Sequence, residues 1–91
     1  MKINEDRLKF RMNEINGIAV TEDGGMMRLA LSDADKAARD MLTGWMEEAG
    51  MTVKVDDMGS VYGILEGSDK NAKPICVGSH TDTQPNGGRY D

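Results

Sequence analysis

The sequence predicts an α/β fold in which two helices pack on a small mixed sheet. Apolar residues recur at helical spacing through the first half of the chain, and the spacing changes to strict alternation directly after Gly50. A chain of 91 residues makes one domain at most. The sequence therefore predicts that residues 1–91 form a single structural unit.

The first predicted helix begins after Asn4, whose side chain can accept a hydrogen bond from the free N–H groups of a helix start. Two acidic residues in its first turn suit the positive end of the helix dipole, namely Glu5 and Asp6. The apolar residues lie at helical intervals and are Leu8, Met12 and Ile15. We expect the helix to end at Asn16–Gly17 and residues 21–25 to form a loop.

The second predicted helix runs from Ser32 to Ala49. Ser32 and Asp35 have the spacing of a capping box, in the weaker variant that uses aspartate. Gly50 follows where a left-handed cap favours glycine. One apolar stripe fits the helical period and predicts the core-facing side, and it contains Ala34, Ala37, Ala38, Met41, Leu42, Trp45, Met46 and Ala49.

Three strands are predicted after this helix. Met51–Asp56 alternates apolar and polar residues, as a half-buried strand does, and Ser60–Leu65 follows a turn, which favours an antiparallel pair. The short apolar run Pro74–Gly78 predicts a third strand that is buried on both faces. The loop after this third strand should lie at its carboxyl end, where ligand sites of open α/β sheets are found.

Composition and charge exclude several classes of partner. The net charge of −5 argues against nucleic acid, which requires a basic surface. No apolar run approaches the ~20 residues of a membrane span. A single cysteine, Cys76, cannot form an internal disulfide, and the first residues are too charged for a secretory signal. We therefore expect a cytoplasmic location.

The segment from residue 78 to 91 carries the residues most suited to chemistry. Because residues two apart in an extended segment face the same way, the carboxylate of Asp82 can reach one ring nitrogen of His80 and leave the other for a metal. A tight turn at residues 85–88 can return Asp91 towards the histidine, and a carboxylate can bridge two metal ions. From spacing alone, a surface loop without a function remains the alternative.

This segment resembles the first metal-binding motif of the M20-type metallohydrolases, in particular the hydantoinase/carbamoylase branch. That branch comprises N-carbamoyl-L-amino acid hydrolases, β-ureidopropionases and allantoate amidohydrolases. The short distance from Asp82 to Asp91 favours it over M20 peptidases and aminoacylases. Thr81 departs from the more usual aliphatic residue, and Gln84 stands where the family often has valine. Three upstream stretches agree with the branch: residues 24–32, 37–50 and 59–67.

The resemblance implies roles for three residues. His80 would bind one metal, Asp91 would bridge both, and Asp82 would orient His80. Two divalent ions (zinc, manganese, cobalt or nickel) would be the cofactor of the parent family. The remaining ligands, the general-base glutamate, the substrate-binding residues and the dimerisation domain of the family would all lie beyond Asp91.

We accordingly expect residues 1–91 to be the amino-terminal, incomplete portion of a dinuclear-metal hydrolase catalytic domain. The parent enzyme would hydrolyse a carbamoyl or ureido C–N bond of a small molecule. The chain alone should be catalytically silent and bind metal weakly or not at all, and it should form a homo-oligomer, most simply a dimer. An M20 peptidase or aminoacylase fragment and a non-catalytic association module remain alternatives. Which carbamoyl or ureido substrate is used stays open.

Overall fold

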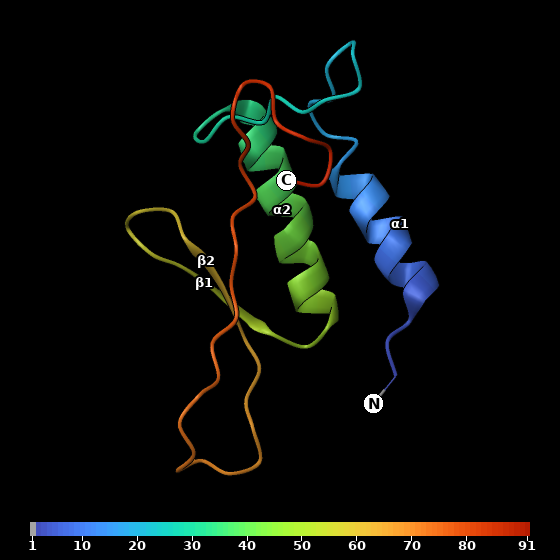
Figure 1. Ribbon diagram of the computed structural model, residues 1–91. Helices are drawn as coiled ribbons and strands as arrows, with labels where there is room; N and C mark the ends of the chain where they lie inside the picture. Colours follow the sequence, from blue (N-terminus) through green and yellow to red (C-terminus); the bar gives the residue numbers. More distant parts are fainter. Residues whose placement is uncertain (1) are drawn as a thin grey trace. The chain divides into compact units, whose positions relative to one another are not determined.

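The computed structural model describes residues 2–91 (Figure 1). Its elements follow the order α1 (Glu5–Ile15), α2 (Asp33–Glu48), β1 (Thr52–Val55) and β2 (Val61–Ile64), which confirms the predicted α/β class. The chain divides into two compact units. One contains the residues up to Ala38 together with Thr81–Asp91, and the other contains Arg39–His80. In the described part of the chain, neither helix is long and apolar enough to cross a membrane.

Helix α1 begins at the predicted cap. The side-chain oxygen of Asn4 accepts a hydrogen bond from the backbone N–H of Arg7 at 2.9 Å. Asn16 follows the last helical residue and donates its backbone N–H to the carbonyl of Met12 at 3.0 Å. No side chain of α1 is buried, so its apolar residues, including the half-exposed Leu8, lie at the surface of this unit.

The start of α2 is held by a reciprocal pair of side chains. The hydroxyl of Ser32 accepts from the backbone N–H of Asp35 at 3.1 Å, which confirms Ser32 as the cap. The carboxylate of Asp35 in turn accepts from the backbone N–H of Leu31 at 3.0 Å. A standard capping box returns to the cap residue itself. Here the shorter aspartate reaches the residue before it, whose φ of 66° lies in the left-handed region.

The end of α2 is a Schellman motif. Gly50 adopts a φ of 84°, as predicted for a left-handed glycine cap. Its N–H donates to the carbonyl of Glu47 at 2.9 Å, and the N–H of Met51 donates to the carbonyl of Met46 at 3.0 Å. The two bonds satisfy carbonyls that a helix end otherwise leaves unpaired.

The predicted core stripe of α2 is less covered than expected. Ala38 is fully buried, Ala37 and Ala49 are exposed, and the other stripe residues, Trp45 among them, are half-buried. Among the described residues, Met26 and Ala38 are the buried apolar side chains. The helical period fixes which side chains share a face, whereas the burial of that face depends on the elements that cover it.

Strands β1 and β2 form an antiparallel hairpin, as predicted. Thr52 pairs with Ile64 and Val55 with Val61, so each strand is one residue shorter at both ends than the predicted range. Asp56 holds the turn through backbone N–H groups, and Gly59 adopts a φ of 89° there. The sulfur atoms of Met46 and Met51 lie so close to Gly63 that a side chain there would meet both.

The prediction of a third strand at Pro74–Gly78 is wrong. Within residues 2–91 the named strands make one two-stranded antiparallel sheet, so the sheet is not mixed. Residues 74–78 are irregular, and Ile75 and Val77 are 93% and 92% exposed. A strand requires a neighbour that completes its ladder of hydrogen bonds, and an apolar run alone does not supply one.

Candidate functional site

The segment that carries Asp82 and Asp91 is tied to an earlier part of the same unit. Met26 and Gly87 exchange both backbone hydrogen bonds, at 2.9 and 3.0 Å, and form an antiparallel bridge. Thr83 lies four residues before Gly87, and its N–H donates to the carbonyl of Arg28 at 2.7 Å. Residues 26–28 thus act as a short template against which residues 83–87 lie.

The template itself belongs to a hairpin that the sequence did not predict. Val20 and Met26 form a second antiparallel bridge, and the N–H of Met27 donates to the carbonyl of Ala19 at 2.9 Å. Met26 therefore pairs on both sides, with Val20 and with Gly87, and its side chain is only 1% exposed. This central position makes Met26 the apolar centre of the unit.

Arg28 is the polar centre of the same unit. The residue is 5% exposed, and its guanidinium donates to three backbone carbonyls from separate parts of the chain. The distances are 2.8 Å from Nε to Thr81, 2.8 Å from Nη1 to Ile15, and 3.1 Å from Nη1 to Ile18. One planar group with five donors can satisfy several acceptors at fixed angles, which a lysine ammonium cannot.

The backbone of Arg28 adds a further contact with the segment that carries the predicted site. Its N–H donates to the hydroxyl of Thr83 at 2.8 Å, and that hydroxyl donates to the carbonyl of Gln84 at 3.0 Å. Thr81 and Thr83, the neighbours of Asp82 on both sides, are therefore each bonded to Arg28. The backbone conformation at Asp82 is fixed by one buried residue.

Charge couples Asp82 to the same arginine. Burial lowers the pKa of the Arg28 guanidinium from its ordinary value, and the negative charges of Asp35 and Asp82 oppose this shift. A buried cation requires nearby anions to offset its lost hydration. The two aspartates supply that compensation, and Asp82 is half-buried while doing so.

The turn that was predicted to redirect the chain is present. The N–H of Gly87 donates to the carbonyl of Gln84 at 3.2 Å, and the N–H of Asp91 donates to the carbonyl of Gly88 at 3.2 Å. A side chain at Gly87 would approach Cβ of Thr83 to 3.0 Å, because the backbone of residue 87 lies directly against the threonine. Glycine is therefore required for the close approach of the two segments.

The three predicted site residues occupy different settings. His80 is exposed and closes the unit Arg39–His80, whereas Asp82 and Asp91 belong to the other unit, where Asp91 is exposed. Within residues 2–91, no group of three or more histidine, cysteine, aspartate or glutamate side chains is arranged to hold a metal ion. The imidazole and carboxylates present are nevertheless the donor types that zinc, manganese and cobalt bind.

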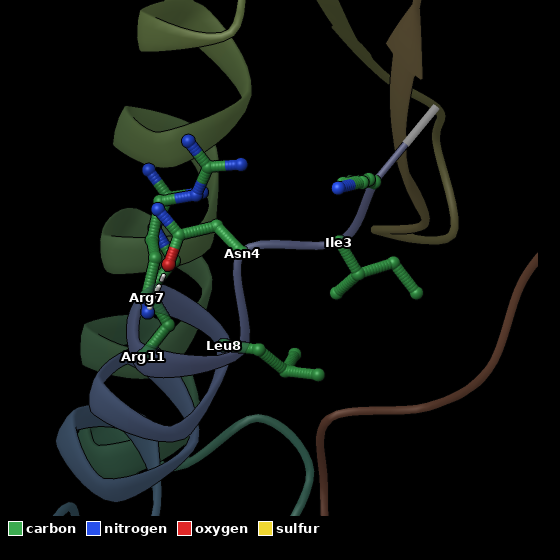
Figure 2. Close-up of a pocket in the computed structure, with 6 residues that line it drawn as sticks. Ile3, Asn4, Arg7, Leu8 and Arg11 are labelled. Atoms are coloured by element: carbon green, nitrogen blue, oxygen red, sulfur yellow. Dashed lines mark hydrogen bonds between the residues drawn. The ribbon is translucent and has the colours of Figure 1, made fainter.

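A surface pocket near the start of α1 involves none of these residues (Figure 2). Three of its side chains are cationic and two are aliphatic, and a hydrogen bond joins two of the lining residues, from the N–H of Arg7 to the side chain of Asn4. Its lining consists of Lys2, Ile3, Asn4, Arg7, Leu8 and Arg11.

The residues that sequence reasoning missed are Arg28 and Thr83. Residues 24–32 form one of the stretches that resemble the family, but the sequence predicts no role for any of them. Arg28 bonds to residues 10, 13 and 53 positions away, so neither spacing nor periodicity reveals the contact. The one sequence feature that could have identified Arg28 is its position as a lone arginine in an apolar stretch, which indicates a buried cation that requires acidic partners elsewhere in the chain.

Comparison with solved structures places the chain beside one class of protein. It is similar to hydantoinase/carbamoylase family amidases from Burkholderia ambifaria (43% identity, TM-score 0.92) and Burkholderia multivorans (46% identity, TM-score 0.92). In both, the match covers 97% of this chain and 22% or 21% of the solved chain. The resemblance expected from the sequence is confirmed. No protein-family model matches the chain.

Curated relatives specify the likeness further. The chain is 41% identical over 90 residues to an N-carbamoyl-L-amino-acid amidohydrolase from Rhizobium meliloti and 36% identical over 90 residues to allantoate deiminase 1 from Glycine max. Both matches cover 99% of this chain. The chain spans only about a fifth of the length of these relatives, 22% and 18% respectively.

Proposed function

We propose that residues 1–91 are the amino-terminal, incomplete portion of the catalytic domain of a metal-dependent amidohydrolase. The parent enzyme hydrolyses the carbamoyl or ureido C–N bond of N-carbamoyl-L-amino acids or related ureido acids. One observation carries the proposal: relatives named for these reactions align with 98–99% of the chain at 35–41% identity. Such a match supports the amidohydrolase reading over an association module.

His80 and Asp91 are the residues proposed to bind metal, and Asp82 is proposed to orient His80. A ligating imidazole donates its second ring N–H to a carboxylate in most metal sites, which fixes the ring orientation. A bound divalent ion (zinc, manganese, cobalt or nickel) supplies Lewis acidity towards the substrate carbonyl and an activated water. With two ligands and no general base among the proposed site residues, the chain by itself is silent.

The substrate class is proposed from the names of the relatives. They act on N-carbamoyl-L-amino acids, allantoate and ureidoglycolate, and all three are small ureido compounds. The chain is 41% identical to a carbamoyl-amino-acid relative and 29% identical to the ureidoglycolate hydrolase, so we place carbamoyl amino acids first. A cytoplasmic location is proposed because the single cysteine, Cys76, is an exposed free thiol.

The test of this function uses the complete reading frame that contains the chain. The encoded enzyme is assayed for ammonia release from an N-carbamoyl-L-amino acid, from allantoate and from ureidoglycolate. An N-acetyl amino acid is the comparison substrate, and its hydrolysis is followed by the release of the free amino acid, because it yields acetate and no ammonia. We expect activity on at least one ureido compound, loss of activity with a chelator, and loss in His80→Ala and Asp91→Ala. Activity confined to the N-acetyl substrate would instead favour the aminoacylase alternative.

A second test concerns metal binding by the 91-residue chain. With His80 and Asp91 as the proposed ligands, calorimetry should detect weak, non-stoichiometric binding of zinc, manganese or cobalt. Binding should weaken further in His80→Ala. Tight binding of two ions per chain would contradict the proposal and indicate that a second copy supplies the missing ligands.

A further inference from the structure

We propose that Arg28 is the positioning residue that sets the orientation of Asp82, and through Asp82 that of the His80 ring. The inference rests on the proposed function, which gives Asp82 and His80 their roles in the site. It goes beyond that function because it assigns a role to a buried arginine that lies outside the predicted metal-binding motif.

Hydrogen bonds from Arg28 hold the residues on both sides of Asp82. Arg28 bonds to the residue before Asp82 through Nε, which donates to the Thr81 carbonyl at 2.8 Å. The backbone of Arg28 also bonds to the residue after Asp82: its carbonyl accepts from the N–H of Thr83 at 2.7 Å, and its N–H donates to the Thr83 hydroxyl at 2.8 Å. Asp82 is thus held on both sides by one residue, and its Cα–Cβ bond direction follows from that backbone.

Arg28 is itself held in one orientation. Its Nη1 donates to the carbonyls of Ile15 and Ile18 at 2.8 and 3.1 Å, so the guanidinium is anchored on the residues that end α1 and follow it. At 5% exposure the group has little room to adopt another rotamer. A fixed donor plane gives the Thr81 carbonyl one bonding position, which a mobile surface arginine would not.

Charge also couples Arg28 to Asp82. Asp82 carries a negative charge close enough to influence the buried guanidinium, together with Asp35. Asp35 is occupied at the start of α2, where its carboxylate accepts from the N–H of Leu31. Attraction between the charges of Arg28 and Asp82 therefore adds to the backbone contacts on either side of Asp82.

The experiment uses the single histidine of the chain as a reporter. In the metal-free chain, nitrogen chemical shifts of the ¹⁵N-labelled His80 ring reveal which nitrogen carries the proton. We expect one tautomer to dominate in the parent, because Asp82 is proposed to accept from one ring nitrogen of His80. In Arg28→Lys and in Asp82→Asn the ring should move towards the mixture of tautomers found in a free imidazole.

The double variant separates positioning from general destabilisation. If Arg28 acts through Asp82, adding Arg28→Lys to Asp82→Asn changes the tautomer ratio no further. Arg39→Lys is the matched control, since Arg39 also donates to a backbone carbonyl, that of Gly59 at 2.5 Å, in the other unit. It should retain the parent ratio. If Arg28→Lys fails to fold, Thr83→Val replaces it, and the same shift of the ring is expected.

Zinc then tests the proposed function separately. In the parent, zinc should perturb the chemical shifts of the His80 ring. Arg28→Lys should weaken zinc binding about tenfold, which is the lower end of the range seen when a group that orients a metal ligand is removed. The expected tautomer changes without any effect of excess zinc on His80 would support the role of Arg28 and overturn the prediction of weak zinc binding by residues 1–91. A parent-like tautomer ratio in folded Arg28→Lys, or additive effects in the double variant, would overturn the role of Arg28.

Discussion

Asp56 shows how much one carboxylate contributes at the turn between β1 and β2. Its Oδ1 accepts from the N–H groups of Ser60 at 2.9 Å and Met58 at 3.0 Å, and its Oδ2 accepts from the hydroxyl of Tyr62 at 3.3 Å. The bond from Ser60 is the largest cause that holds the pKa of Asp56 below its ordinary value of 3.8. The ionised form is therefore favoured in the folded turn.

This shift predicts an acid-dependent loss of stability. A group whose pKa is lowered by folding contributes its full stabilisation above the unfolded value of 3.8 and loses it as the pH falls through the lower folded value. Thermal melts should therefore drop below pH 3.8, and the drop should be smaller in Asp56→Asn. Asp57→Asn, which removes an equal charge outside these three bonds, should keep the parent profile. Identical profiles for the parent and Asp56→Asn would contradict the assignment.

Trp45 tests the packing of α2. Replacing a fully buried tryptophan by alanine lowers the free energy of unfolding by about 3–5 kcal/mol. Since Trp45 is half-buried, we expect Trp45→Ala to lower the free energy of unfolding by about 1–3 kcal/mol. Ile75→Ala serves as the control, because Ile75 is 93% exposed. The free energy of unfolding of this variant should lie within about 0.5 kcal/mol of the parent value. Overlapping melts of Trp45→Ala and the parent would mean that the face of α2 is assigned wrongly.

Local residue patterns predicted the caps correctly and missed the buried arginine for the same physical reason. Asn4, Ser32 and Gly50 act on backbone groups a few positions away, so the sequence alone contains both partners of each contact. Arg28 binds carbonyls that any residue possesses, at positions up to 53 residues away. Its partners leave no mark in the sequence, and only the fold reveals them.

At the scale of an element, α2 contains two glycines with opposite expected effects. Gly50 adopts a φ of 84° in the cap, where a side chain is strained, so Gly50→Ala should destabilise by about 1 kcal/mol. Gly44 lies within the helix, and a Cβ there would meet nothing within 4 Å. Gly44→Ala should therefore stabilise by about 0.5–1 kcal/mol. Chemical denaturation of the two variants measures both, and the same sign for both would refute the cap geometry.

Elements defined by local contacts were predicted better than elements defined by distant ones. The helices and the β1–β2 hairpin have their partners nearby in the chain, and their period and turn residues are sufficient to find them. Residues 74–78 have the composition of a buried strand but pair with no strand among residues 2–91. The Met26–Gly87 bridge is the reverse case, since its two residues carry no strand pattern and are brought together by the fold.

At the scale of the whole molecule, little of the apolar surface is covered. Leu31, Met58, Ile75 and Val77 are each at least 88% exposed, and the buried apolar side chains of the described residues are Met26 and Ala38. Exposed apolar surface of this kind recruits partners. The predicted metal site is also incomplete. Its proposed residues are one histidine and two aspartates, and a metal centre requires more ligands than these.

We therefore predict that the chain self-associates, most simply as a two-fold dimer. Burial stabilises by about 25 cal/mol per Å², which over several hundred Å² exceeds the repulsion between chains of net charge −5 when salt screens charges beyond about 8 Å. Sedimentation equilibrium should show a concentration-dependent dimer. In Ile75→Lys/Val77→Lys the two lysines reduce the net negative charge and with it the repulsion between chains. Association should nevertheless weaken, because the loss of apolar contact is the larger effect. Both side chains lie outside the helices and strands, so the fold should be retained. A monomer from micromolar to millimolar concentration would contradict the prediction.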